Sequence, residues 1–462
     1  MRKMNCNTHF NVLFQLVILF LVLIYSDIAF GYDNALFEPP DGTTYHGVGW
    51  YASAQENYSG LFSDSTQPLL FQTMSAIPGS RGRAVTVEGI VNGLQPARFY
   101  SDRQFCELGI QFTDNTNAYD SVFAFTDELD SYIDTFAQAI IRHDRPIFLR
   151  IGFEMNGNWN GYTPYTYPAA FRKLVDGFRN RGAENFATVW CYEPDAATDF
   201  ADSTEEGWKW YPGDDYVDWF GLDLFRPDHF DPAEPDSGRG GYSSKGKSEL
   251  FLRFARERGK PVYLNELSAS HVFITPEERD PDSADAIHDW ELWFEPFFEF
   301  MDIHPEIKAF NYINLDWTQF EQWEHWGDAR LEINSYIANR WVAALSDPRY
   351  IHIGYDIENP NQNSVEEQFD INISLPGVIK LTAYPNPFNS STNISFILEN
   401  NHFINLEIYD ILGRRIARLL NDNMTPGAHK ISFNGNNLGS GQYFIRLKAD
   451  RQETINNIIL IK

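Results

Sequence analysis

Eight short runs of apolar, β-branched and aromatic residues recur between residues 45 and 317, and they restrict the fold of this chain more than any other feature. Runs that are apolar on both faces are typical of strands in a parallel sheet that helices cover. Eight such strands in alternation with helices predict a (β/α)8 TIM barrel of the α/β class. The runs are YHGVGWYA (45–52), PLLFQTM (68–74), FCELGIQF (105–112), RPIFLRIGFE (145–154), FATVWCYE (186–193), YVDWFGLDLF (216–225), PVYLNE (261–266) and IKAFNYINLDW (307–317).

Helical periodicity fills two of the gaps between these runs. One set of apolar residues falls on a single helical face before the fourth run, and a second set does so before the fifth. Gly182 and Gly259 stand where helices would end before the fifth and seventh strands. The two apolar sets are Leu129, Tyr132, Ile133, Phe136, Ile140 and Ile141, and Phe171, Leu174, Val175 and Phe178.

The start of the chain differs from this central region. A basic N-terminus and the apolar run 12–25 are followed by small residues at Ala29 and Gly31, which predicts a signal peptide over residues 1–31. No second apolar run is long enough to span a bilayer. We therefore expect an exported protein without a transmembrane segment.

The composition changes again near residue 356. We expect the barrel domain to cover residues 32–355 and the polar stretch 356–380 to be a linker. Beyond it, short alternating runs such as NISFIL and QYFIRLKA are bounded by clusters of Asn, Gly and Pro. This pattern predicts a small all-β antiparallel sandwich domain over residues 381–462.

The balance of charge restricts the partners of this protein. A formal net charge of −28 would repel nucleic acid and anionic membranes, so a neutral partner is favoured. Cys106 and Cys191 lie in apolar runs, where buried free thiols are expected rather than a disulfide framework. The motifs of zinc sites, P-loops, dinucleotide-binding folds and serine hydrolases are absent from the sequence, so we expect no cofactor and no metal. We also expect a monomer.

Several of the predicted strands end in carboxylates, and working residues of a TIM barrel stand at the C-terminal ends of its strands. Aromatic residues crowd the same segments, and their flat faces suit sugar rings whose hydroxyls seek hydrogen bonds. Cleavage of a glycosidic bond by a retaining route needs two carboxyls about 5–5.5 Å apart. The strand-end carboxylates are Glu154, Glu193, Asp223, Glu266 and Asp316.

The fourth and seventh strands end in Glu154 and Glu266, which could reach this separation across the barrel mouth. The same pattern also fits glutamates that cap loops or pair with arginine. Arg150 points the same way along its strand as Glu154 and is expected to support a neighbouring carboxylate. Asn156 would orient Glu154 or shape the turn, and Trp190 is either a sugar contact or part of the core.

The segments FEMNGNW (153–159), YPGDDYVDWFGLD (211–223) and KPVYLNE (260–266) occur in an order that resembles glycoside hydrolase family 26, over roughly residues 40–345. This resemblance implies a retaining β-glycanase, best known as an endo-β-1,4-mannanase. It implies that Glu154 is the acid/base and Glu266 the nucleophile. It also implies sugar platforms at Trp159 and Trp317, with Asp223 beside them near the substrate.

Two residues depart from the pattern of that family. Phe153 stands where a histidine usually precedes the acid/base, and Phe225 replaces a tyrosine two residues after Asp223. Both changes remove a polar group from the active centre, where hydrogen bonds select the sugar. β-1,3-Xylan and mixed-linkage β-glucan therefore remain alternatives to mannan. We also expect Phe153 to keep Glu154 poorly solvated and protonated.

The last segments of the chain, including YPNPFNSSTNISF and LGSGQYFIRLKA, resemble the C-terminal sorting domain of the type IX secretion system. This resemblance implies a Gram-negative cell whose secretion machinery recognises residues 381–462. The whole chain is thus expected to be a secreted or cell-surface β-glycanase that cleaves a neutral polysaccharide, mannan first. The rival interpretation is a glycan-binding protein of the same fold that lacks turnover.

Overall fold

The computed structural model describes two compact units, which divide between Ser364 and Val365. The predicted leader (1–31) and most of the predicted linker (356–380) lie outside the described residues. Among the described residues, no helix has the length and apolarity that a membrane span requires. The described residues are 35–79, 84–95, 104–114, 116–202, 207, 209–230, 243–358, 381–384, 388, 390–398, 401–410, 414–425, 427–436, 438–449 and 452–460.

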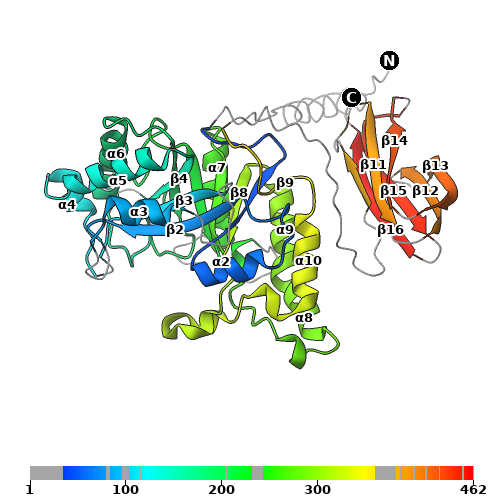
Figure 1. Ribbon diagram of the computed structural model, residues 1–462. Coiled ribbons are helices and arrows are strands. Elements are labelled where there is room, and N and C mark those ends of the chain that lie inside the picture. The colour runs from blue at the N-terminus through cyan, green and yellow to red at the C-terminus, as the bar shows by residue number, and fades with distance from the viewer. Residues whose placement is uncertain are drawn as a thin grey trace, which may run out of the picture. The chain divides into compact units, whose positions relative to one another are not determined.

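The first unit is a closed barrel of eight parallel strands, as the sequence predicts (Figure 1). Each strand pairs with the next along the chain, and β1 pairs with both β8 and β2 to close the ring. A short ninth strand, Tyr350–Ile351, pairs with the start of β1. The barrel strands are β1 Thr44–Val48, β2 Leu70–Ala76, β3 Phe105–Gln111, β4 Ile147–Ile151, β5 Phe186–Tyr192, β6 Trp219–Leu224, β7 Val262–Leu267 and β8 Ile307–Tyr312.

Helices surround this barrel and bury apolar stripes against the outer faces of the strands. α5 and α6 carry the two predicted faces, except that Ile141 is 44% exposed. Gly182 and Gly259 have φ values of 80° and 61°, shortly after α6 and α7 end. The α-helices are α2 Ala52–Ser59, α3 Val87–Gly93, α4 Asp120–Phe125, α5 Asp130–His143, α6 Thr166–Arg179, α7 Ser244–Arg256, α8 Ala284–Asp289, α9 Glu295–Ile303 and α10 Ser335–Leu345. Short 3-10 or π segments are η1 Pro227–His229, η2 Glu277–Arg279, η3 Trp290–Phe294, η4 Trp317–Gln319, η5 Glu321–Trp326 and η6 Leu331–Ile333.

The interior of the barrel changes from apolar to polar along its axis. Because side chains alternate along a strand, every second residue of a barrel strand faces inward. Near the N-terminal ends, Phe148 packs against Tyr45, Trp219 and Tyr263 in one apolar cluster. Two residues further along β4, Arg150 stands in a buried polar layer. The barrel therefore has a packed apolar layer near its N-terminal end and a buried charged layer closer to its C-terminal mouth.

The second unit consists of two antiparallel sheets, ordered β10-β11-β14 and β13-β12-β15-β16. Apolar residues of both sheets share one core, which makes the unit a sandwich. Phe388 lies in that core and forms a bridge with Leu460 on the last strand. The strands are β10 Leu381–Tyr384, β11 Ser391–Leu398, β12 His402–Asp410, β13 Arg415–Met424, β14 Gly427–Asn434, β15 Gly441–Ala449 and β16 Gln452–Leu460.

Candidate active site

Glu154 lies three residues beyond the end of β4, at the C-terminal mouth of the barrel. Its backbone has φ = 50°, a left-handed conformation that few residues other than glycine adopt. Gly152, with φ = 54°, precedes it in the same turn. Such a conformation costs on the order of 1–3 kcal/mol and persists only where the surroundings impose it.

Two asparagines impose the conformation of this turn. Asn160 is 4% exposed and donates from Nδ2 to the carbonyl oxygens of Phe153 (3.0 Å) and Glu154 (2.9 Å). Asn156 is 2% exposed and donates to the carbonyl oxygen of Glu193 (2.7 Å), while its Oδ1 accepts from the N–H of Glu193 (3.1 Å). The turn that carries Glu154 is thus tied to itself and to the segment that follows β5.

Trp159 contacts the carboxylate of Glu154 directly. Its Nε1 donates to Glu154 Oε2 at 2.6 Å, and the side chain is 53% exposed. The indole lies against Gly157, where an added Cβ would come within 2.3 Å of the ring. Glycine at 157 therefore lets Trp159 reach the carboxylate and still present an open face at the mouth.

The environment of Glu154 favours its protonated form. Burial and the nearby charge of Glu266 raise the pKa of Glu154, and the hydrogen bond from Trp159 and the charge of Arg150 lower it. The result is a pKa of about 7 for Glu154. A carboxyl with such a pKa can donate a proton near neutral pH.

Glu266 lies on β7, and two side chains, Arg150 and Asp223, fix its position. Arg150 Nη2 lies 2.6 Å from Glu266 Oε1 in a buried ion pair. Asp223 on β6 accepts a hydrogen bond from the Glu266 N–H at 3.0 Å and lies 3.3 Å from Arg150 Nη1. One carboxylate oxygen each from Glu154, Asp223 and Glu266 lie within 4.8 Å of one another. The structure thus brings together the two glutamates that the sequence singled out.

Glu107 on β3 completes the buried polar layer and was not among the predicted residues. Arg150 Nε lies 2.8 Å from Glu107 Oε1, while Gln72 and Asn311 donate to Oε2 at 3.0 and 2.8 Å. Burial raises the pKa of Glu107 to about 7, although Arg150 opposes this shift. The sequence did offer a sign of this role, because Glu107 is a charged residue inside the apolar run FCELGIQF. A carboxylate buried in such a strand needs a buried partner.

The two phenylalanines that depart from the family pattern both pack on functional neighbours. The ring of Phe153 lies 4.1 Å from the guanidinium carbon of Arg150 in a cation–π contact. Phe225 lies 4.8 Å from Trp326, ring centre to ring centre, at the end of β6. Phe153 thus supports the residue that holds Glu266, and its effect on the solvation of Glu154 stays a prediction.

Four of the expected substrate contacts are not open to a substrate in this structure. Trp190 is fully buried and faces outward against α7, so it is part of the core. Trp317 is only 1% exposed, because neighbouring indoles cover it. Asn156 and Asp223 are also buried and direct their polar atoms to protein groups. These four residues are enclosed by protein groups, so their roles toward a substrate stay predictions, and among the predicted sugar contacts Trp159 alone is exposed.

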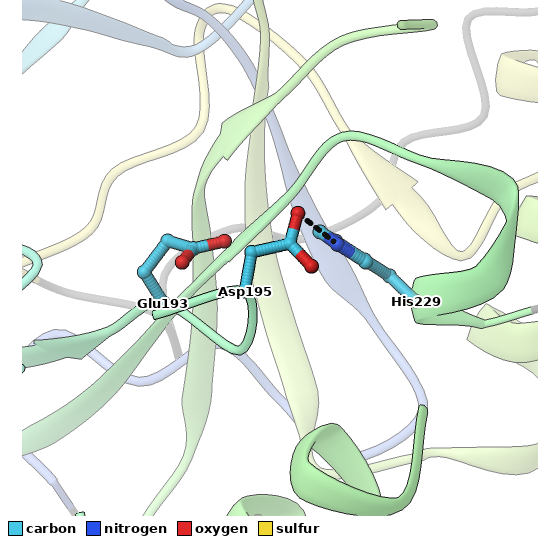
Figure 2. A group of neighbouring side chains, drawn as sticks. All are labelled: Glu193, Asp195 and His229. Carbon is cyan, nitrogen blue, oxygen red and sulfur yellow. Dashed lines mark ion pairs between the residues drawn. The ribbon is translucent and has the colours of Figure 1, made fainter. Parts of the chain in front are cut away.

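A second cluster follows β5 and β6, where Glu193, Asp195 and His229 bring one ligand-type atom each within 4.8 Å of one another (Figure 2). His229 Nδ1 accepts the N–H of Phe225 (3.1 Å), and Nε2 faces Asp195 Oδ2 at 3.1 Å. A neutral imidazole whose Nδ1 is an acceptor carries its proton on Nε2, whereas a metal needs a lone pair there. The histidine therefore presents an N–H to Asp195 and does not form a ready-made metal site.

Glu193 is the least satisfied member of this cluster. It is 3% exposed, and no donor among the described residues reaches its Oε2. Burial, together with the charges of Asp195 and Glu154, raises the pKa of Glu193 well above its usual range. The neutral acid is therefore favoured, which relieves repulsion of the nearby Glu154.

Comparison with known proteins gives two family matches along the chain. Residues 106–237 match glycosyl hydrolase family 26, and residues 382–462 match the secretion system C-terminal sorting domain. Two parts of the chain are thus similar to known families, residues 106–237 to a glycosyl hydrolase family and residues 382–462 to a sorting domain. A protein with this sorting domain is secreted or displayed at the cell surface.

Three similar proteins illustrate these matches. The chain is 31% identical over 243 residues to beta-1,3-xylanase TXYA of Vibrio sp (48% of each chain), and 28% identical over 249 residues to a beta-1,3-xylanase of Alcaligenes sp (50% of this chain, 49% of the other). It thus spans about half the length of the curated relatives it matches. A solved structure of a Cellulomonas fimi endo-beta-1,4-mannanase double mutant is similar with a TM-score of 0.46 and 15% identity, over 91% of this chain and 95% of that one.

Proposed function

We propose that this protein is a secreted retaining β-glycan hydrolase in which Glu154 is the acid/base and Glu266 the nucleophile. The observation that supports this best is the approach of their carboxylate oxygens to within 4.8 Å of each other. Inverting enzymes hold their carboxyls roughly 6.5–9.5 Å apart to admit a water molecule, whereas retaining enzymes hold them at about 5–5.5 Å. The short separation favours two successive displacements at one sugar carbon.

The environments of the two glutamates suit different roles. Glu154, with its raised pKa of about 7, would donate its proton to the leaving glycosidic oxygen as that bond breaks. Glu266, held by Arg150, would attack the anomeric carbon and form a glycosyl ester. Glu154 would then remove a proton from water, and the hydroxide would displace Glu266 from the sugar.

We propose β-1,3-xylan as the first substrate. Two relatives named as beta-1,3-xylanases support this choice. The earlier expectation of a β-1,4-mannan is kept as the second candidate. The glycan-binding alternative without turnover is disfavoured because two carboxylates lie close together and one of them, Glu154, has a raised pKa.

We further propose that the type IX secretion machinery is the partner of the C-terminal sandwich. The match of residues 382–462 to the sorting domain supports this, and so does a core separate from that of the barrel. The predicted signal peptide would take the chain across the inner membrane first.

The test is an assay of the purified chain on β-1,3-xylan, β-1,4-mannan and mixed-linkage β-glucan, with released reducing ends as the readout. We expect turnover of one β-glycan, with a loss of several orders of magnitude in Glu266→Gln and in Glu154→Gln. Glu278→Gln, at an exposed site on η2, is the matched control. Equal activity in all four proteins would remove both glutamates from the site, and inactivity of the unsubstituted chain on every glycan would contradict the proposed function.

A further inference from the structure

A row of aromatic side chains lies on the β8 and β1 side of the barrel mouth. We define the aromatic shelf as Tyr51, Phe320 and Trp323. Tyr51 immediately precedes α2, Phe320 lies between η4 and η5, and Trp323 lies in η5. Tyr51 is 50% exposed, and its ring lies nearly parallel to that of Phe320, at 10° with ring centres 6.1 Å apart. Phe320 and Trp323 are half-buried and contact each other at 5.7 Å between ring centres.

The shelf is continuous with the candidate active site. Trp317 contacts Phe320 (6.4 Å) and Trp323 (5.6 Å) by ring-centre distance, and its Nε1 donates to Ser268 Oγ at 2.9 Å. Ser268 is two residues beyond Glu266 on the chain. A line of packed aromatic rings therefore runs from Ser268, just after β7, to the aromatic shelf.

The backbone next to the shelf is held in an unusual conformation. Trp50 has φ = 53°, a left-handed conformation that is rare for a bulky residue. Its N–H donates to Gln72 Oε1 (3.1 Å), and Gln72 Nε2 donates to Glu107 (3.0 Å) in the polar layer below. Trp50 also contacts Tyr51 and Trp323 at 5.1 and 6.0 Å between ring centres. The polar layer of the active site thus fixes the position of the shelf.

The position of the shelf indicates which part of a substrate it faces. In an eight-stranded barrel β4 lies across the mouth from β8, so the shelf lies opposite Glu154 and Trp159. If Glu154 protonates the leaving oxygen, the departing part of the glycan lies on the β4 side. The part that stays bound to Glu266 then extends toward β8 and β1.

We propose that the aromatic shelf is a distal binding site for a neutral β-glycan, on the non-reducing side of the bond that is cleaved. Exposed, nearly parallel rings stack on the C–H faces of sugars, and no bound charge is needed for this recognition. This inference rests on the proposed function. It adds that the enzyme distinguishes long from short chains through Tyr51 and Phe320.

The test compares Tyr51→Ala and Phe320→Ala with Phe125→Ala, an exposed aromatic residue on α4 that stacks on Tyr165 outside the shelf. For each protein, kcat/KM is measured on a ladder of β-1,3-xylo-oligosaccharides and, in parallel, on a ladder of β-1,4-manno-oligosaccharides. We expect the ratio of kcat/KM for the longest to the shortest cleaved substrate to fall about fivefold to tenfold in each shelf variant. The ratio should be unchanged in the Phe125 variant.

An equal loss on all chain lengths, or an unchanged ratio, would overturn the shelf proposal while the hydrolase proposal stands. If the unsubstituted chain cleaves neither ladder, the hydrolase proposal fails. Retardation of each protein in gels that contain soluble xylan or mannan then tests the shelf alone. Retardation that is lost only in the two shelf variants would support it, and equal migration of all four proteins would contradict it.

Discussion

Glu154 occupies a backbone conformation that glutamate seldom adopts, and Asn160 bonds the two carbonyl oxygens that frame it. At this position a small rotation of the backbone would swing the carboxyl away from a glycosidic oxygen. Asn160 therefore acts as a positioning residue, because its side chain is buried and its amide group donates to the carbonyl oxygens of Phe153 and Glu154. Its effect should concern proton donation and not nucleophilic attack.

We expect Asn160→Ala to reduce kcat/KM on polysaccharide by about 10²-fold, since misplacement of an acid by an ångström has effects of this size. Aryl glycosides with acidic leaving groups need no proton, so they should lose much less. The control is Asn158→Ala, an exposed asparagine in the same turn. Steady-state kinetics on both substrate types decide the matter, and equal losses on both would contradict a role in placing the acid.

The hydrogen bond from Trp159 to Glu154 makes a prediction about pH. This bond lowers the pKa of Glu154, so its removal in Trp159→Phe should raise that pKa above about 7. Because the protonated acid is the active form, the alkaline limb of kcat/KM against pH should move to higher pH. A limb that stays in place, or moves to lower pH, would show that the bond does not set the acidity of Glu154.

At the scale of elements, one arginine joins strands that are distant in sequence. Arg150 on β4 contacts Glu107 on β3, Asp223 on β6 and Glu266 on β7, with no exposed surface of its own. Removal of one partner from a buried ionic group leaves the other charges uncompensated, which typically costs 3–5 kcal/mol. This layer therefore couples the strands of the barrel to the geometry of the site.

We expect Arg150→Met to lower the free energy of unfolding of the barrel by about 3–5 kcal/mol in urea denaturation. The matched control is Arg142→Met, which breaks an ion pair with Glu88 whose side chains are 57% and 63% exposed. Such an exposed pair is worth about 0–1 kcal/mol at most. Similar effects of the two substitutions would mean that the buried layer is not the source of the stability.

The strands of the barrel could be predicted from the sequence, because each one is a continuous apolar run. Such a run can be recognised from neighbouring residues alone. Side chains alternate between the two faces of β5, so Trp190 faces outward because Val189 beside it faces inward. This alternation could have removed Trp190 from the candidate sugar contacts. The partners of Arg150 could not be predicted, because they depend on the register of four strands that are far apart in the chain. The cover over Trp317 also depends on contacts between distant loops.

At the scale of the whole molecule, the barrel and the sandwich each possess a core of their own. We expect a chain that ends at residue 380 to keep full hydrolytic activity, because the barrel closes on itself without the sandwich. Delivery to the medium or the cell surface should be lost in the native host, as immunoblots of cell fractions would show. Normal delivery of the shortened chain would contradict the sorting role, and loss of its activity would contradict the independence of the barrel.

The central claim is that two carboxylates within 4.8 Å of each other cleave a β-glycan with retention at the anomeric carbon. The most direct measurement is proton NMR of the hydrolysis of a β-linked oligosaccharide by the purified chain, followed from the first minutes before the products mutarotate. We predict that the β-anomer of the new reducing end appears first and the α-anomer only later, by mutarotation. Initial formation of the α-anomer would contradict the account, because it would require a single displacement by water.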